Sequence, residues 1–465
     1  MKHTGWLWMA FFVALCPLMA EPGPIEVGFE TTPTGTVPTT WDVPSPVTEA
    51  GYLAAVTDVD KHTGEQALSL RHPSVPPQGN RSIGGVNSSL DATPFRGQRI
   101  VLRAWAKPDR GSQANLWLRI DGEDGKRTFF ANLGDQLITR SEWVEYELVA
   151  PVVEQAGNIA FGLLLQGGGQ VLLDDLRIEA VGAIDAGNEP ARPLDEQALE
   201  RLETWAHIVG LVRYFHPSDQ VANADWHEVI MAGVETLEAS APTSLAARIA
   251  PLLAPLAPTA TIRDDRFEGG DRPQATHPER GSRIVWRHLG VGLGPSQVYK
   301  SERIAYKDED LDTPETMSLP SGLELDLPLT VWRVASGVTV PEVEGDTPRS
   351  SKPPYFVSSG NDRTTRLSVV IEAWALFRHF YPYFDVVDTD WDAALRAALK
   401  AAATDDGESF VDTLGRLVAA LHDGHGGVGG PIRGTAMIPL GARWLGDELV
   451  VTSAGPGSRW THRPG

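Results

Sequence analysis

Hydrophobic and polar residues alternate with a period of two along the first third of the chain. Between about residues 25 and 183, short alternating runs are separated by glycine, proline, asparagine and aspartate, which favour turns. Strands this short between frequent turns are typical of an antiparallel β-sandwich. The predicted strands include residues 99–107, 115–121, 143–149, 158–166 and 170–179.

The period becomes helical after a joint rich in glycine, alanine and proline at residues 181–193. Apolar residues then recur every three or four positions and form one stripe: Leu202, Trp205, Ile208, Val209 and Val212. Pro217 should end this helix, because proline cannot continue a helical hydrogen-bond ladder. Asp225 is a favourable N-cap for the next helix.

The same helical pattern returns later in the chain. Residues 213–217 (Arg-Tyr-Phe-His-Pro) correspond to residues 378–382 (Arg-His-Phe-Tyr-Pro), and Asp225-Trp226 corresponds to Asp390-Trp391. Both pairs differ by 165 in residue number, which predicts an internal duplication of a helix–proline–loop–helix unit.

The strand-like and helical periods of the hydrophobic residues together predict a multidomain α+β protein. The predicted order is a β-sandwich at residues 21–183, a first helical unit with a strand insertion at 194–355, and a second helical unit at 361–430. The sandwich segment resembles the jelly-roll, galactose-binding-like accessory modules of secreted enzymes. Three segments carry this resemblance: residues 63–68 (Thr-Gly-Glu-Gln-Ala-Leu), 161–163 (Phe-Gly-Leu) and 171–178, which contains Asp174-Asp175.

The first twenty residues have the pattern of a secretory signal peptide. Lys2 precedes an apolar run at residues 6–15, and Ala20 offers a small residue for cleavage. We therefore expect an exported protein, periplasmic or extracellular, that loses residues 1–20; a buried N-terminal helix and a lipid-anchored Cys16 are the alternatives. Cys16 is the only cysteine, so the mature chain would have no disulfide and no cysteine nucleophile.

The net charge of the chain limits which classes of binding partner are expected. The chain has 40 lysine and arginine residues against 61 aspartate and glutamate residues, a formal net charge of −21 at pH 7. A surface of this sign repels phosphate, so nucleic acid and anionic membranes are not expected partners. No later apolar run is long enough to span a bilayer, and no transmembrane segment is expected in the mature chain.

Two tryptophans in the predicted sandwich are candidates for carbohydrate binding. Strand alternation places Trp105 on the same side as Arg103, and Trp117 on the same side as Asn115 and Arg119. A tryptophan on a polar face can stack on a sugar ring while arginines bond its hydroxyl groups. The alternative is that a neighbouring domain or loop covers both tryptophans.

Residues 374–428 contain several motifs in a fixed order. They include residues 379–382 (His-Phe-Tyr-Pro), 390–392 (Asp-Trp-Asp) and 421–425 (Leu-His-Asp-Gly-His). This arrangement resembles the N-terminal helical region of the tail-specific (C-terminal-processing) serine peptidases, in which a PDZ-like domain and then an α/β core with the nucleophilic serine follow. The resemblance implies that residues 431–465 are the truncated start of the PDZ-like domain.

The resemblance also implies a function. The complete protein would be an exported serine peptidase acting on polypeptides, and this chain would be its non-catalytic front portion. In the tricorn-like branch, a histidine at the turn matching His425 activates the serine as a general base; the alternative is a structural histidine that closes the helix end.

Other functions remain open. A secreted, non-catalytic carbohydrate- or protein-binding protein is the alternative function, and a glycan-active enzyme is a third. No cofactor is predicted: His422 and His425 are three residues apart, but no further ligand accompanies them as a metal site requires.

Overall fold

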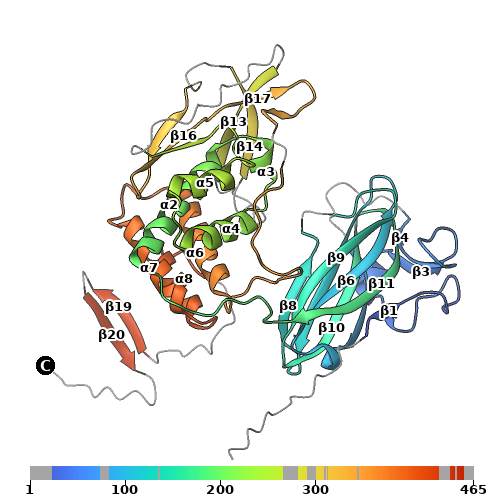
Figure 1. Ribbon diagram of the computed structural model, residues 1–465. Helices are drawn as coiled ribbons and strands as arrows, with labels where there is room; N and C mark the ends of the chain where they lie inside the picture. The colour runs from blue at the N-terminus through green and yellow to red at the C-terminus, as the bar shows by residue number, and fades with distance from the viewer. Residues whose placement is uncertain are drawn as a thin grey trace, which may run out of the picture. The chain divides into compact units, whose positions relative to one another are not determined.

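The chain folds into two compact units in this computed structural model (Figure 1). The sandwich unit comprises residues 1–190 and 351–362, and the helical unit comprises residues 191–350 and 363–465. The structure describes residues 23–73, 83–134, 137–264, 281–290, 300–307, 311, 313–342, 345–428, 440–445 and 448–454.

The sandwich unit consists of two antiparallel sheets, which confirms the predicted β-sandwich. The first sheet has the order β3 (Leu53–Thr57), β4 (Ala67–His72), β11 (Gly169–Ala183), β6 (Gln98–Pro108) and β9 (Val144–Val152), with β1 (Ile25–Val27) paired to β11. The second has the order β2 (Trp41–Asp42), β5 (Ile83–Asp91), β10 (Ala156–Gln166), β7 (Gln113–Gly122) and β8 (Arg127–Asn132). Two short helices, α1 (Ser45–Glu49) and η1 (Thr93–Phe95), connect strands.

The core of the sandwich lies between the sheets, and alternation along each strand decides which residues enter it. On β6, Leu102 and Ala104 are buried in the core, whereas Arg103 and Trp105 lie on the outer side. On β7, the core residues Leu116, Leu118 and Ile120 likewise alternate with outward residues.

A returning segment of chain covers part of the outer side of the first sheet. Tyr355 packs on Arg103, whose guanidinium carbon lies 5.4 Å from the ring centroid, and a hydrogen bond joins the two side chains. Within the same unit, the Lys352 ammonium bonds the Asp362 carboxylate at 2.5 Å. Residues 351–362 therefore belong to the sandwich unit, although alternation in the sequence indicated an end at residue 183.

Helices and small sheets build the helical unit. The helices are α2 (Glu196–Phe215), α3 (Asp219–Asn223), α4 (Trp226–Glu238), α5 (Leu245–Leu253), α6 (Arg363–Phe380), α7 (Trp391–Thr404) and α8 (Ser409–Ala419). Between α5 and α6 lie one sheet of β12 (Thr261–Asp264), β16 (Leu323–Leu327) and β15 (Glu315–Ser318), and another of β14 (Lys300–Tyr306), β13 (Gly281–Gly290), β17 (Val331–Val334) and β18 (Thr339–Val340). The mixed α+β class with strand insertions is as predicted.

The predicted helix boundaries are confirmed. Helix α2 ends at Phe215, two residues before Pro217. The carboxylates of Asp225 and Asp390 accept backbone N–H groups at the starts of α4 and α7.

Both helical segments share one hydrophobic core. Trp205 of α2, Trp374 of α6 and Trp391 of α7 are all buried in it, and the ring N–H of Trp374 donates to the Trp391 carbonyl at 2.9 Å. Helices α6 and α7 pack against helix α2 in this unit (Figure 1). The two segments thus form one compact unit, and their origin by duplication stays a prediction.

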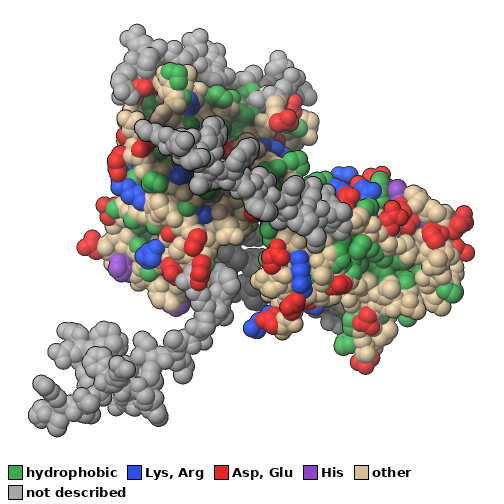
Figure 2. All heavy atoms as spheres, turned by 60° about the horizontal axis from the view of Figure 1, so that its bottom comes forward, with side chains coloured by type: hydrophobic (Ala, Val, Ile, Leu, Met, Phe, Trp, Pro, Cys, Tyr) green, Lys and Arg blue, Asp and Glu red, His purple; other side chains and the backbone are tan. Residues whose placement is uncertain are grey.

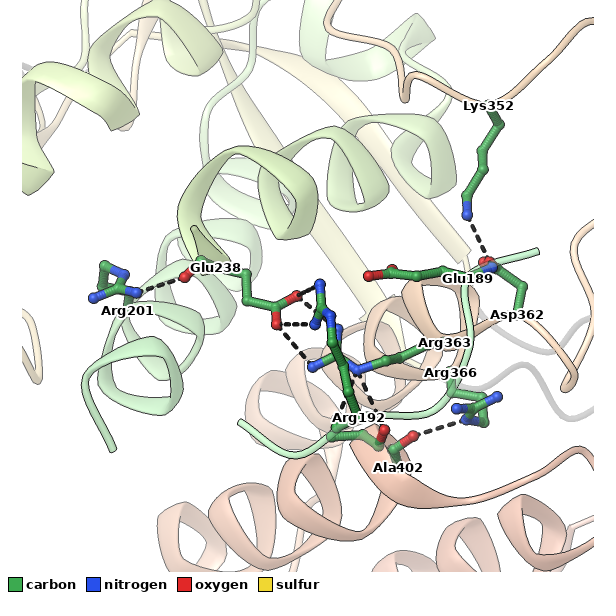
Figure 3. Close-up of polar contacts among 10 residues, drawn as sticks. Glu189, Arg192, Arg201, Glu238, Lys352, Asp362, Arg363, Arg366 and Ala402 are labelled. Atoms are coloured by element: carbon green, nitrogen blue, oxygen red, sulfur yellow. Dashed lines mark hydrogen bonds and ion pairs between the residues drawn. The ribbon is translucent and has the colours of Figure 1, made fainter. Parts of the chain in front are cut away.

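A buried carboxylate ties α4 to the start of α6. Glu238 accepts two hydrogen bonds from Arg363, at 2.6 and 2.8 Å, and also pairs with Arg192. Arg363 has 0% of its side chain exposed and Glu238 only 12%. Figure 3 shows both guanidinium groups converging on this carboxylate. The backbone carbonyl of Glu238 accepts a further bond from Arg201.

Close packing of α2 on α4 depends on a glycine. A Cβ atom at Gly233 would overlap the Trp205 indole, so Gly233→Ala should destabilise the helical unit by roughly 1–3 kcal/mol. In α8, a Cβ atom at Gly415 would meet nothing within 4 Å, and Gly415→Ala should instead stabilise by roughly 0.5–1 kcal/mol. Urea unfolding of both variants checks the opposite signs; equal effects would contradict the packing described.

Two predicted features lie largely or wholly outside the described residues. The signal peptide at residues 1–20 is outside them. Within residues 431–465, the structure describes an antiparallel pair, β19 (Leu440–Leu445) and β20 (Glu448–Ala454), near the predicted opening strands of a PDZ-like domain; the domain itself stays a prediction. No helix in the described part of the chain is long and apolar enough to cross a membrane.

Candidate binding face of the sandwich

Two aromatic rings stack with each other on the outer face of the second sheet. Trp117 of β7 and Phe130 of β8 point away from the core, and their ring centroids are 6.5 Å apart with an angle of 25° between the planes. Phe130 is 46% exposed, and Trp117 is half-buried. The near-parallel rings form an apolar strip across two neighbouring strands.

A glycine on the next strand makes room for the tryptophan. Trp117 lies opposite Gly162 in the pairing of β7 with β10. A Cβ atom on Gly162 would come within 2.8 Å of the indole nitrogen and 3.0 Å of Cε2. The indole therefore lies across β10, over Gly162, rather than standing upright on the sheet.

Polar side chains surround the two rings. Arg119 of β7 forms an ion pair with Asp121 at 3.0 Å, and Asn158 of β10 donates to the same carboxylate at 3.5 Å. Across Gly162, the register places Asn87 of β5 on the same outer face, with Asp42 of β2 opposite it. The face therefore combines an aromatic strip with amide, carboxylate and guanidinium groups.

Trp105 lies on the other sheet, so it cannot share a site with Trp117. The His62 ring stacks on it with a centroid distance of 3.7 Å and an interplanar angle of 11°. Trp105 also borders a cavity of about 450 Å³ whose lining includes Asp174 and Asp175. Stacking by His62 makes Trp105 a poorer platform for a sugar ring than Trp117.

The acidic side chains beside Trp105 form hydrogen bonds with the loop that carries His62. Asp174 accepts the backbone N–H groups of His62 and Thr63, at 2.8 and 3.2 Å, and Asp175 bonds the His62 ring. Burial raises the pKa of the Asp174 carboxyl. These bonds hold the loop against β11.

Arg103 already has bonding partners within the sandwich unit. It is buried between Glu147, Glu179 and Tyr355. A sugar hydroxyl could reach it only by replacing one of these partners. Arg103 therefore fits a role in fixing residues 351–362, whereas Arg119 is half-exposed on the face that carries Trp117.

His425 lies on the turn after α8. Its side chain is 99% exposed, and its ring nitrogen Nδ1 and its backbone N–H both bond the Asp423 carboxylate, at 2.8 and 2.9 Å. These bonds lower the pKa of Asp423. The Asp423 contact can hold the ring and fix its tautomer, and the general-base role stays a prediction.

In the residues that the structure describes, no group of three or more histidine, cysteine, aspartate or glutamate side chains could hold a metal ion.

Figure 2 shows, on the face that it presents, hydrophobic side chains gathered in a patch on the sandwich unit with acidic side chains around it. An apolar patch with a polar rim is typical of a binding surface.

Sequence reasoning found Trp117 and Arg119 but missed Phe130 and Gly162. The pair Phe129-Phe130 was the available signal, because alternation must turn one of two adjacent aromatic residues outward. Which strand neighbours β7 on each side depends on long-range pairing, and a single sequence gives little information on that pairing.

No family model matches the chain. The uncharacterized HTH-type transcriptional regulator YbfP of Bacillus subtilis (strain 168) is 34% identical over 93 residues, which cover 19% of this chain. The chain spans only 31% of that regulator's length. The resemblance to tail-specific peptidases gains no support from these comparisons and stays a prediction.

Several solved structures are weakly similar to this chain. The CBM22-1 xylan-binding domain of Paenibacillus barcinonensis Xyn10C has 15% identity and a TM-score of 0.25, covering 34% of this chain and 94% of that domain. TmCBM61, solved in complex with β-1,4-galactotriose, has 17% identity and a TM-score of 0.24, covering 33% of this chain and 94% of that chain. The enzymatically active domain of bacteriophage CBA120 tailspike protein 4 has 12% identity and a TM-score of 0.25, covering 31% of this chain and 20% of that chain.

Proposed function

We propose that the sandwich unit is a carbohydrate-binding module and that the face around Trp117 and Phe130 is its binding surface. One side of a sugar ring consists of C–H groups, which pack well on an aromatic ring, while its hydroxyl groups point outward from the ring edge. The aromatic strip with polar neighbours offers both kinds of contact. This pair of rings is the observation that carries the proposal.

A docking site for another protein is the competing function. The cores of protein–protein interfaces are depleted of aspartate, glutamate and lysine side chains, whereas arginine is common there. The Asp121 carboxylate instead lies beside the rings on the Trp117 strand, where a sugar hydroxyl could bond it. The mixture of groups therefore favours a glycan over an apolar protein surface.

The module would hold the rest of the protein on a polysaccharide. Export to the periplasm or the cell exterior, where such polymers occur, is part of this proposal. A serine peptidase activity of the complete protein is a separate prediction, and carbohydrate binding does not depend on it.

Trp117→Ala should weaken binding to soluble polysaccharides by roughly tenfold or more, because an aromatic anchor is worth more than about 1.4 kcal/mol at a typical site. Affinity electrophoresis of residues 21–465 through gels containing β-1,4-linked glycans (xylan, galactomannan, hydroxyethylcellulose) or α-linked glycans (amylose, pullulan) measures this loss. Tyr383→Ala is the matched control, because Tyr383 is an exposed aromatic residue of the helical unit. Retention of the wild type in no gel, or equal retention of the Trp117 variant, would contradict the proposal.

A further inference from the structure

Exposed apolar side chains of the helical unit are concentrated on the loop between α6 and α7. Val386 is 73% exposed, and Tyr383, three residues earlier, is 53% exposed. Among the described residues of this unit, Leu289 is the only other large apolar residue that is exposed. The loop therefore presents a small apolar surface to water.

Contacts within the loop and with α7 hold it in one arrangement. The backbone N–H groups of Val386 and Val387 both donate to the Tyr383 carbonyl, at 3.0 and 3.1 Å. The Phe384 ring packs on the buried Trp391 ring with a centroid distance of 5.7 Å. A partner would meet Tyr383 and Val386 in a fixed geometry, so little conformational entropy would be lost on binding.

The same loop lies against the end of α8. The Tyr381 hydroxyl donates to the Leu421 carbonyl at 3.0 Å, and the Thr389 hydroxyl donates to the Ala420 carbonyl at 2.6 Å. These two bonds join the loop to the turn that follows α8.

A cavity of about 430 Å³ lies at this turn, lined by the last part of α8 and by residues of the glycine-rich segment 422–428. Asp423 belongs to its lining. Desolvation and the nearby Asp423 carboxylate raise the pKa of the Tyr381 hydroxyl, which places the cavity beside the loop. We call residues 381–389 and 422–428 together the loop surface.

The charged groups of the loop are carboxylates. Asp385 and Asp388 are exposed, and in the described part of the chain neither forms an ion pair. Residues 379–395 contain no lysine or arginine, and Arg378, just before them, pairs with Asp392 at 3.7 Å. The loop is therefore acidic as well as apolar, and a cationic segment with apolar side chains complements it.

We propose that the loop surface docks a cationic segment of another protein. Apolar side chains of that segment lie on Tyr383 and Val386, and its lysine or arginine side chains pair with Asp385 and Asp388. The formal charge of −21 on the chain attracts such a partner over longer distances. A second copy of this chain fits poorly, because it would bring the same carboxylates together. The proposal is independent of carbohydrate binding and of any peptidase activity.

Three fluorescein-labelled peptides of equal length test the proposal. They share their leucine and phenylalanine residues and carry lysine, serine or glutamate at the positions between them. In fluorescence anisotropy with residues 21–465 at about 150 mM salt, which screens distant charges, the lysine peptide should bind roughly tenfold or more tightly than the other two. Asp385→Asn together with Val386→Ser should weaken its binding roughly tenfold, because an ion pair and an apolar contact are both lost.

A second Asp–Val pair in the chain gives the matched control. Asp58 and Val59 are both exposed on the sandwich unit, and Val59 is 88% exposed. Asp58→Asn together with Val59→Ser removes the same carboxylate and the same apolar side chain, and it should leave the affinity for the lysine peptide unchanged. Thermal unfolding of both double variants should match that of the wild type, because all four side chains are exposed.

Equal affinities of the two double variants for the lysine peptide would overturn the proposal, because attraction by net charge alone would then explain the binding. Tight binding of the glutamate peptide, or no binding of the lysine peptide to the wild type, would overturn it as well. Self-association of the wild type in sedimentation equilibrium, lost in the Asp385→Asn, Val386→Ser variant, would identify the occupant as a second copy and overturn the cationic partner.

Discussion

Replacing Glu238 by alanine should lower the unfolding free energy of the helical unit by about 3–5 kcal/mol. The substitution would leave Arg363, which is fully buried, and Arg192 without their common carboxylate. A buried guanidinium keeps its own desolvation cost when a carboxylate partner is removed, and this cost adds to the loss of the hydrogen bonds themselves. Urea unfolding at pH 7, followed by tryptophan fluorescence, measures the change.

Glu196→Ala is the matched control. Glu196 also holds two cations, Lys400 and Arg396, but its side chain is 69% exposed. Water and salt screen such an ion pair, so Glu196→Ala should lower the unfolding free energy much less than Glu238→Ala does. Equal losses for the two variants would show that the Glu238 carboxylate is solvated in solution rather than buried.

The sequence contained enough information to predict the strands and helices, because their periods are local. Alternation placed Trp105 and Trp117 on outer faces, and the Asp225 and Asp390 caps could be recognised from residue type and position alone. Tertiary contacts gave no such signal. Nothing near Arg363 in the sequence distinguishes it from an exposed arginine in a first helical turn, since its partner Glu238 lies 125 residues away.

At the candidate site, too, the local sequence pattern predicts the direction of a side chain but not its tertiary contacts. The outward orientation of Trp117 follows from its strand, but its accessibility depends on the chain that passes over each sheet. On the first sheet, His62 stacks on Trp105 at a centroid distance of 3.7 Å, and Tyr355 packs on Arg103. On the second sheet, Phe130 stacks with Trp117 at the longer distance of 6.5 Å. Two tryptophans with similar sequence neighbourhoods therefore have different ring neighbours, which come from distant parts of the sequence.

Acidification should destabilise the helical unit through His216. This histidine is fully buried, and its two ring nitrogens contact the Ser218 and Thr259 hydroxyl groups at 3.1 and 2.8 Å. Burial lowers the pKa of His216 from 6.5 to about 3. The folded protein thus keeps the ring neutral at pH values where the unfolded chain binds a proton, so stability falls as the pH drops from about 6.5 towards 3. The loss from this group should be about 2 kcal/mol at pH 5 and about 4–5 kcal/mol near pH 3.

His216→Gln isolates this contribution, because an amide can still bond both hydroxyl groups but does not titrate. The difference in unfolding free energy between pH 7 and pH 5, measured with urea, should shrink by about 2 kcal/mol in this variant relative to the wild type. His379, whose pKa burial lowers to about 4, adds its own loss to both proteins and cancels in the comparison. An unchanged pH dependence in His216→Gln would mean that His216 reaches water and titrates near its ordinary pKa in the folded protein.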